Sequence, residues 1–68
     1  MTRVRIIVYP LTGGGGRRVR ANGEILGRAR SLGELLEFLR RAGLDPEDVD
    51  LRDPELFEWR GGGPDIWE

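Results

Sequence analysis

The chain has 68 residues, of which 34% are charged and 38% are hydrophobic, and its formal net charge is −1. That length accommodates one small domain. The longest apolar run covers only residues 6–9, whereas a transmembrane helix needs about 20 apolar residues, so we expect no membrane contact. No apolar leader segment follows the basic first residues, which predicts a cytoplasmic protein.

The side chains most often used in catalysis are scarce. The chain has no Cys and no His, which excludes disulfides, thiolate metal ligands and a Ser-His-Asp triad. The acidic residues crowd into one short segment, without the spacing of a calcium loop and without a partner carboxylate across a cleft. We therefore expect a non-enzymatic protein with no cofactor, no metal and no small-molecule substrate.

The small net charge conceals two halves of opposite sign. Residues 1–41 contain nine Arg and three Glu, a formal charge of +6, and residues 42–68 contain two Arg and nine acidic residues, a formal charge of −7. All eleven basic residues are Arg. Either the two halves pack together and neutralise each other, or the basic half faces a polyanion.

The first half of the chain carries the pattern of three strands. Residues 3–9 are rich in β-branched side chains and place Val4, Ile6 and Val8 on one face, which predicts a strand that Pro10 ends. A glycine-rich loop at residues 12–16 then leads into a hairpin over residues 17–30, with Asn22-Gly23 at its turn.

Two registers are compatible with this hairpin. A two-residue turn at Asn22-Gly23 would place Ile25 beside the outward-facing arginines. We prefer a three-residue loop over residues 21–23, because it pairs Arg20 with Glu24 and keeps one face apolar. The residues that this register turns outward are Arg18, Arg20, Leu26, Arg28 and Arg30.

A full set of local signals predicts a helix over about residues 32–42. Ser31 is an N-cap residue, and Glu34 three positions later completes a capping box. Leucines follow at i, i+3, i+4 and i+7 spacing, which marks the buried stripe of an amphipathic helix. Gly43 is a typical left-handed residue at a helix end.

Two Asp-Pro-Glu turns follow the helix, with one or two short strands around residues 49–51 and 57–60. Together the elements define an α+β fold in a small single domain over residues 1–60. We expect an antiparallel sheet in the order β-β-β-α plus the short C-terminal strands, with the helix packed on one face. Residues 61–68 form a glycine-hinged tail with an apolar anchor.

The predicted sheet presents an arginine-rich face away from the helix. Guanidinium groups beside an aromatic ring on an open sheet are typical of proteins that hold phosphates and stack bases of single strands. Nucleic-acid binding is therefore one candidate function, unless the acidic segment 45–58 covers this face. The candidate residues are Arg3, Arg5, Tyr9, Arg18, Arg20, Arg28 and Arg30.

Aromatic residues near the glycine-hinged terminus favour a protein partner. An aromatic anchor can fill a partner's pocket, which indicates a small protein-interaction or regulatory module whose tail deletion, residues 64–68, would leave the fold intact. Alternatively, Trp67 folds back onto the core of its own domain. A thin core and exposed strand edges favour a homodimer as a third arrangement. The candidate protein-binding residues are Leu56, Phe57, Trp59, Ile66 and Trp67.

The last residues also resemble a family signature. Residues 58–67, EWRGGGPDIW, are similar to the C-terminal W-R-G-G-G-P-D-V-W of a group of small uncharacterised proteins from high-GC bacteria, some of them encoded on mobile elements. The hairpin, the S-x-x-E-L-x-x-F-L-R helix at Ser31–Arg40 and the D-P-x-L turn at Asp53–Leu56 extend the resemblance over about residues 17–68. It implies a bacterial protein, compatible with an accessory factor of a mobile element, and no established activity.

A second resemblance concerns Arg60-Gly61-Gly62, which is similar to the R-G-G end of ubiquitin-like modifiers. The small β-grasp fold of those proteins also has a hairpin that leads to a helix. Six residues follow Gly62, so conjugation would require their removal. A ubiquitin-like modifier precursor is therefore a further alternative.

Overall fold

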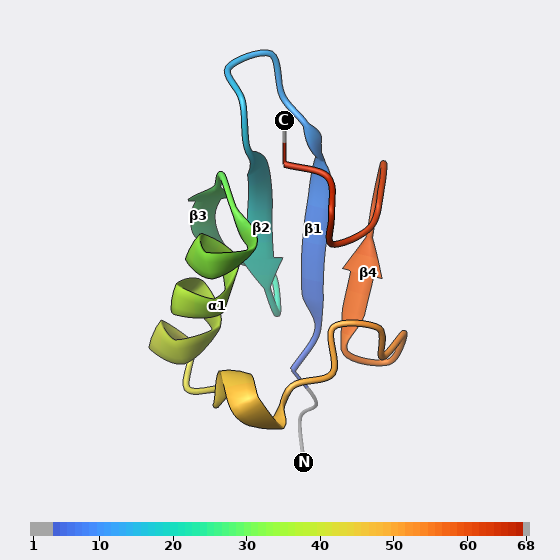
Figure 1. Ribbon diagram of the computed structural model, residues 1–68. Helices are drawn as coiled ribbons and strands as arrows, with labels where there is room; N and C mark the ends of the chain where they lie inside the picture. Colours follow the sequence, from blue (N-terminus) through green and yellow to red (C-terminus); the bar gives the residue numbers. More distant parts are fainter. Residues whose placement is uncertain (1–3, 68) are drawn as a thin grey trace.

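The computed structural model describes residues 4–67 and contains one sheet and one α-helix (Figure 1). In chain order the elements are β1 (Ile6–Leu11), β2 (Arg17–Ala21), β3 (Glu24–Ala29), α1 (Leu32–Arg41), the 3₁₀ turn η1 (Pro46–Asp48) and β4 (Phe57–Trp59). The β-β-β-α order confirms the predicted α+β class. Within the described residues, no helix has the length and apolar character needed to cross a membrane.

The four strands form one sheet in the order β3-β2-β1-β4. The pairs β1–β2 and β2–β3 are antiparallel, whereas β4 runs parallel to β1, with Ile6 facing Phe57 and Val8 facing Trp59. Parallel pairing requires a crossover connection. Residues 42–56 supply it by returning the chain to the end of the sheet where β1 begins (Figure 1). Two short strands were expected after the helix. The second is present as β4, whereas residues 49–51 contain no strand.

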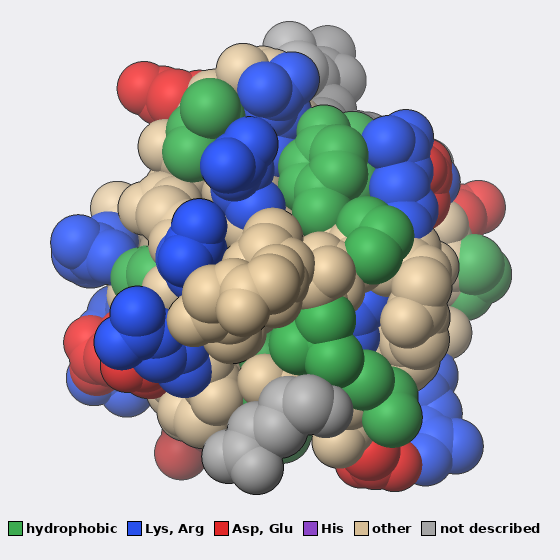
Figure 2. Space-filling view, turned by 90° about the horizontal axis from the view of Figure 1, so that it is seen from above, with side chains coloured by type: hydrophobic (Ala, Val, Ile, Leu, Met, Phe, Trp, Pro, Cys, Tyr) green, Lys and Arg blue, Asp and Glu red, His purple; other side chains and the backbone are tan. Residues whose placement is uncertain are grey.

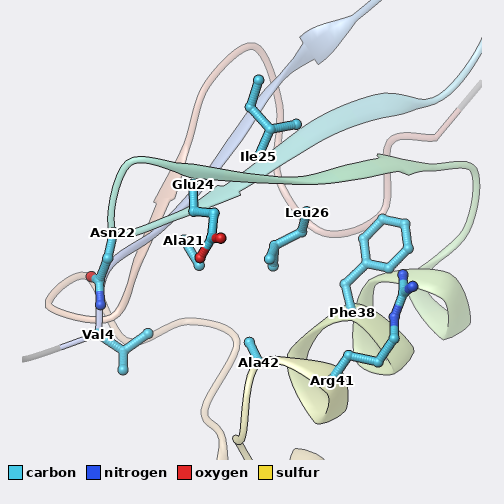
Figure 3. Close-up of a pocket in the computed structure, with 9 residues that line it drawn as sticks. All are labelled: Val4, Ala21, Asn22, Glu24, Ile25, Leu26, Phe38, Arg41 and Ala42. Carbon is cyan, nitrogen blue, oxygen red and sulfur yellow. The ribbon is translucent and has the colours of Figure 1, made fainter.

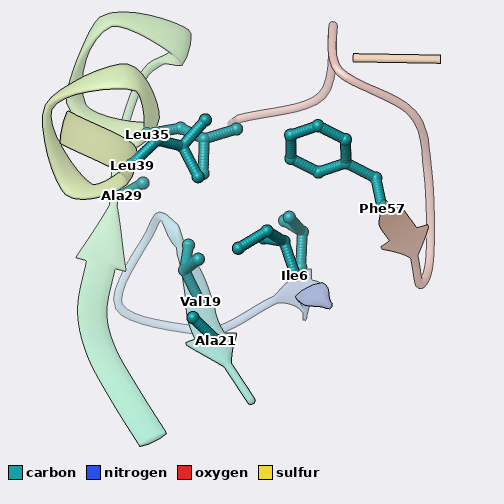
Figure 4. Close-up of a cluster of buried hydrophobic side chains, with 8 residues drawn as sticks. Ile6, Val19, Ala21, Ala29, Leu35, Leu39 and Phe57 are labelled. Atoms are coloured by element: carbon teal, nitrogen blue, oxygen red, sulfur yellow. The ribbon is translucent and has the colours of Figure 1, made fainter. Parts of the chain in front are cut away.

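The helix α1 packs its apolar stripe against one face of the sheet. Leu35 and Leu39 are fully buried, and Figure 4 shows them opposite the inward side chains of β1 and β2, with Phe57 closing the far side. Burial of each large apolar side chain stabilises the fold by roughly 1.5–3 kcal/mol. The buried hydrophobic residues are Ile6, Val8, Val19, Ala21, Ala29, Leu35, Leu39 and Phe57.

The ends of α1 follow the predicted capping pattern, except that the Glu34 carboxylate binds the backbone N–H one residue before the N-cap. The Ser31 hydroxyl accepts a hydrogen bond from the Glu34 backbone N–H at 3.2 Å, and the Glu34 carboxylate accepts one from the Arg30 N–H at 2.6 Å. At the other end Gly43 has a φ of +91°. This left-handed residue lets the Leu44 N–H reach the Leu39 carbonyl at 2.9 Å, which ends the helix in the Schellman manner.

The register preferred for the hairpin is wrong. Asn22 and Gly23, with φ of +51° and +85°, form a two-residue turn in which Ala21 faces Glu24 and Arg20 faces Ile25. Two positive φ values suit the twist of a hairpin. The ladder then shifts, so that Val19 faces Gly27 and Leu26 is the extra residue of a bulge. The expectation assumed a regular ladder, but the bulge returns the chain to a register that keeps the core face apolar.

As a result, Ile25 and Leu26, the two apolar residues after the turn, point to opposite sides of the sheet. Leu26, predicted to face outward, packs against the core on the helix side, and Ile25 is 55% exposed on the opposite side of β3. Figure 3 shows the two side chains pointing away from each other across the strand. The predicted Arg20–Glu24 ion pair is absent from the described part of the chain.

The loop before β2 depends on a glycine that no other residue can replace easily. Gly16 has a φ of +81° and is buried, and a Cβ added there would lie 2.9 Å from Cγ of Arg28 and 3.0 Å from the Ala29 carbonyl oxygen. Gly16→Ala should therefore lower the free energy of unfolding by about 1–3 kcal/mol. Urea denaturation measures this change.

Gly13→Ala is the matched control in the same loop. A Cβ at Gly13 would meet no atom within 4 Å, so this substitution should change stability by less than about 0.5 kcal/mol. Equal stability of the two variants would contradict the packing described for Gly16.

Candidate nucleic-acid interface

The sheet has one covered and one open face. The helix α1 and the tail after β4 both lie on the covered side, where the core is (Figure 1). Because side chains alternate along a strand, residues 18, 20 and 28 point to the other side when Val19 and Ala29 point into the core. Figure 2 shows basic side chains along the upper and left edges of the view, with hydrophobic groups between some of them, and further basic side chains beside acidic ones at the right.

Two arginines face each other directly across β2 and β3. Arg18 and Arg28 are cross-strand partners, and both are exposed. Like charges in this position repel, because their Cβ atoms are only about 4.5–5.5 Å apart. Neither guanidinium forms an ion pair with any residue between 4 and 67. Arg30 continues the same side of β3, since its side chain and that of Arg28 both border Gly16.

A second row of groups crosses the sheet beside this pair. The guanidinium carbons of Arg20 and Arg60 lie 5.9 and 5.2 Å from the centre of the Tyr9 ring, within the range of cation–π attraction. Arg20 is also flanked by Ile7 and Ile25 in the ladder. Its Nε is buried and has no hydrogen-bond acceptor within the described chain. These neighbours hold the Arg20 side chain in place without neutralising it.

Acidic neutralisation is found at the β4 edge. The Glu58 carboxylate pairs with Arg60, and its distance to the Arg5 guanidinium is 3.3 Å. Hydrogen bonds from Arg60 and then Arg5 lower the pKa of Glu58 below its ordinary value. Arg5 also donates to the Pro54 carbonyl at 2.6 Å. The charges of Arg5 and Arg60 on this edge are therefore paired with Glu58. No ion pair within residues 4–67 involves Arg18, Arg20, Arg28 or Arg30.

Most of the predicted basic residues share this face. Tyr9, Arg18, Arg20 and Arg28 lie on its strands, Arg30 follows β3, and Arg3 lies outside the described residues. Arg60, which the sequence pattern does not assign to this face, joins it because β4 pairs with β1. The alternation of Glu58, Trp59 and Arg60 indicates which side each residue faces, but only once the pairing of β4 is known.

Arg17 has a structural role that its sequence context does not predict. This residue is fully buried next to the core, where burial lowers the pKa of its guanidinium. Its guanidinium donates to five carbonyl oxygens: Tyr9 at 2.8 Å, Arg60 at 2.8 Å, Gly62 at 2.7 Å, Gly63 at 2.7 Å and Ile66 at 3.1 Å. The buried charge is thus surrounded by backbone dipoles, three of them from the tail and one from Arg60 just before it.

Two indole rings complete the environment of Arg17. Its guanidinium carbon lies 5.4 Å from the Trp59 ring centre and 5.6 Å from that of Trp67. The two rings meet edge to face at 6.3 Å, and the Trp67 Nε1–H donates to the Pro64 carbonyl at 2.6 Å. Of the two arrangements considered for Trp67, the structure shows the one that folds back onto its own domain.

The proposed protein-binding residues are consequently engaged in the fold. Phe57 is buried and stacks on Trp59 at 5.5 Å, and the Trp59 Nε1–H donates to the Leu51 carbonyl at 2.8 Å. Leu56 is half-buried, while Ile66 is 42% exposed. These five residues do not form one exposed aromatic surface.

Comparison with known proteins gives no match: no family model, no curated protein and no solved structure is similar to this chain. The resemblances to the bacterial W-R-G-G-G-P-D-V-W group and to ubiquitin-like modifiers therefore stay predictions. Any functional conclusion has to come from the geometry and charge of the open face.

The hydrogen bonds from the Arg17 guanidinium to the tail can be tested by a substitution that keeps the charge. Arg17→Lys leaves three donors on a flexible stem in place of five donors in a fixed planar group. Several tail carbonyls then lose their partner, and the free energy of unfolding should fall by about 2 kcal/mol or more. Thermal and urea denaturation measure the loss.

Arg18→Lys, one residue further along β2, is the control. Its side chain is exposed, so the change should lie within about 0.5 kcal/mol. If Arg17→Lys is as stable as Arg18→Lys, the tail does not depend on the guanidinium.

Proposed function

We propose that this protein binds nucleic acid through the open face of its sheet, mainly by contacts to phosphates. The observation that carries the proposal is the cross-strand pair Arg18–Arg28, two exposed like charges with no ion-pair partner among residues 4–67. Such a pair costs stability in the unbound chain. Phosphate groups of a polyanion would offset that repulsion and accept charge-assisted hydrogen bonds from the planar guanidiniums.

The distribution of charge supports a local contact. The chain as a whole has a formal charge of −1, so long-range attraction to a polyanion is weak. The open face nevertheless carries Arg18, Arg20, Arg28 and Arg30 without ion-pair partners in the described chain. We therefore expect modest affinity, with the bound strand at these four arginines and away from Glu58 at the β4 edge.

Protein binding through the C-terminal aromatics has less geometric support. Phe57, Trp59 and Trp67 are each held by contacts inside the fold, and a partner would have to displace them. The alternative of a small interaction module stays a prediction, as does a homodimer. No observation in residues 4–67 favours either over the arginine face.

Fluorescence anisotropy with a labelled, mixed-sequence, single-stranded DNA dodecamer tests the proposed function. Binding should weaken steeply with salt, with a slope of log K against log salt of about −3 if four phosphates are contacted. The double variant Arg18→Ala/Arg28→Ala should weaken binding about ten-fold or more at low salt and make the slope shallower by about 1.4, because two phosphate contacts are lost.

The matched control removes the same two charges from elsewhere. Arg40 and Arg41 lie on the exposed part of α1, on the covered side of the sheet. Arg40→Ala/Arg41→Ala should keep most of the affinity and the original slope. Equal losses in the two double variants, or binding that ignores salt, would rule out a site on the open face.

A further inference from the structure

A hollow lies on the open face where β1 departs from regular geometry. The pairing of β1 with β2 shifts between Val8 and Leu11, and Pro10 in this bulge has no N–H to donate to a ladder. The tail packs close to this bulge, since a Cβ at Gly61 would lie 2.7 Å from Cβ of Pro10. The hollow measures about 360 Å³, and its lining residues are Tyr9, Pro10, Leu11, Thr12, Arg18 and Arg20.

The lining combines two kinds of surface. Tyr9, Pro10 and Leu11 provide an apolar wall, and Arg18 and Arg20 provide positive charge beside it. Neither arginine has an ion-pair partner in residues 4–67. A flat apolar group joined to an anion would match both surfaces at once. A nucleotide with an unpaired base has that chemistry.

We infer that this hollow holds one unpaired nucleotide, and that the protein therefore prefers single strands to duplexes. This inference rests on the proposed function and adds the form of nucleic acid that the face selects. The base packs on the wall formed by Tyr9, Pro10 and Leu11, and the adjoining phosphates contact Arg18 and Arg20. In a duplex the bases are paired and stacked inside, so only the phosphates can reach this face.

The spacing of the two arginines agrees with an extended strand. Arg18 and Arg20 are two residues apart on β2 and point to the same side, which separates their Cα atoms by about 6.8 Å. At that spacing the two guanidiniums can each contact one of two neighbouring phosphates along a strand. The helix α1 lies on the opposite side of the sheet (Figure 1), so it is not placed to enter a groove of duplex DNA.

Three labelled dodecamers distinguish the inference from the proposed function: a mixed-sequence single strand, the same strand in a duplex, and an abasic strand with the same number of phosphates. At one low salt concentration the intact single strand should bind about five-fold or more tightly than the abasic strand, because one base contact is lost in the latter. It should also bind more tightly than the duplex.

Substitution of Tyr9 locates the base contact. In Tyr9→Ala the ratio of the abasic to the intact dissociation constant should fall close to one, whereas Arg18→Ala should weaken both strands and keep the ratio. If Tyr9→Ala does not fold, as judged by its circular dichroism and melting curve, Leu11→Ala removes another part of the wall and should reduce the ratio.

The unpaired-nucleotide site and the proposed function would be overturned by different results. Equal binding of intact and abasic strands, or tighter binding of the duplex, would overturn the unpaired-nucleotide site and leave phosphate binding in place. Absence of salt-dependent binding to all three would overturn the proposed function itself.

Discussion

The fold depends on a buried arginine that has backbone carbonyls in place of a carboxylate partner. A buried charge is costly unless hydrogen bonds replace the water it has lost. Arg17 meets that requirement with five carbonyl oxygens and two indole faces. Because four of the carbonyls belong to residues 60–66, the charge on β2 fixes the path of the tail over the core. The tail thereby becomes part of the folded domain.

The arginines on and next to the sheet fall into three groups. Arg17 donates its hydrogen bonds mainly to carbonyls of the tail. Arg5 and Arg60 are paired with Glu58 at the β4 edge. The remaining group on β2 and β3 has no ion-pair partner between residues 4 and 67. Since alternation along β2 points Arg17 inward and Arg18 outward, neighbouring residues of the same type have opposite roles. The open face keeps its positive charge because the acidic segment pairs with it only along an edge of the sheet within the described residues.

Local signals were enough to predict α1, the presence of a first strand and the α+β class, because caps, periodicity and turn residues act within a few positions. The end of that strand was predicted wrongly, since β1 continues through Pro10 to Leu11. The alternation also placed Arg18, Arg20 and Arg28 on one face, as observed. The hairpin register was predicted wrongly, since the bulge at Leu26 depends on packing against the helix. The role of Arg17 could not be predicted, because four of its five acceptors lie more than 40 residues later in the chain. For the same reason the sequence did not reveal Arg60 beside Tyr9.

The most direct test is a two-dimensional amide NMR titration of the isotopically labelled chain with a single-stranded dodecamer at low salt. We predict shifts concentrated on residues 9–12, 18–20 and 28–30, which reverse when salt is added. The Trp59 and Trp67 indole signals should stay unchanged, because both rings pack around Arg17 on the covered side. Shifts concentrated on α1 or on the tail, with the strands of the open face unaffected, would contradict this prediction.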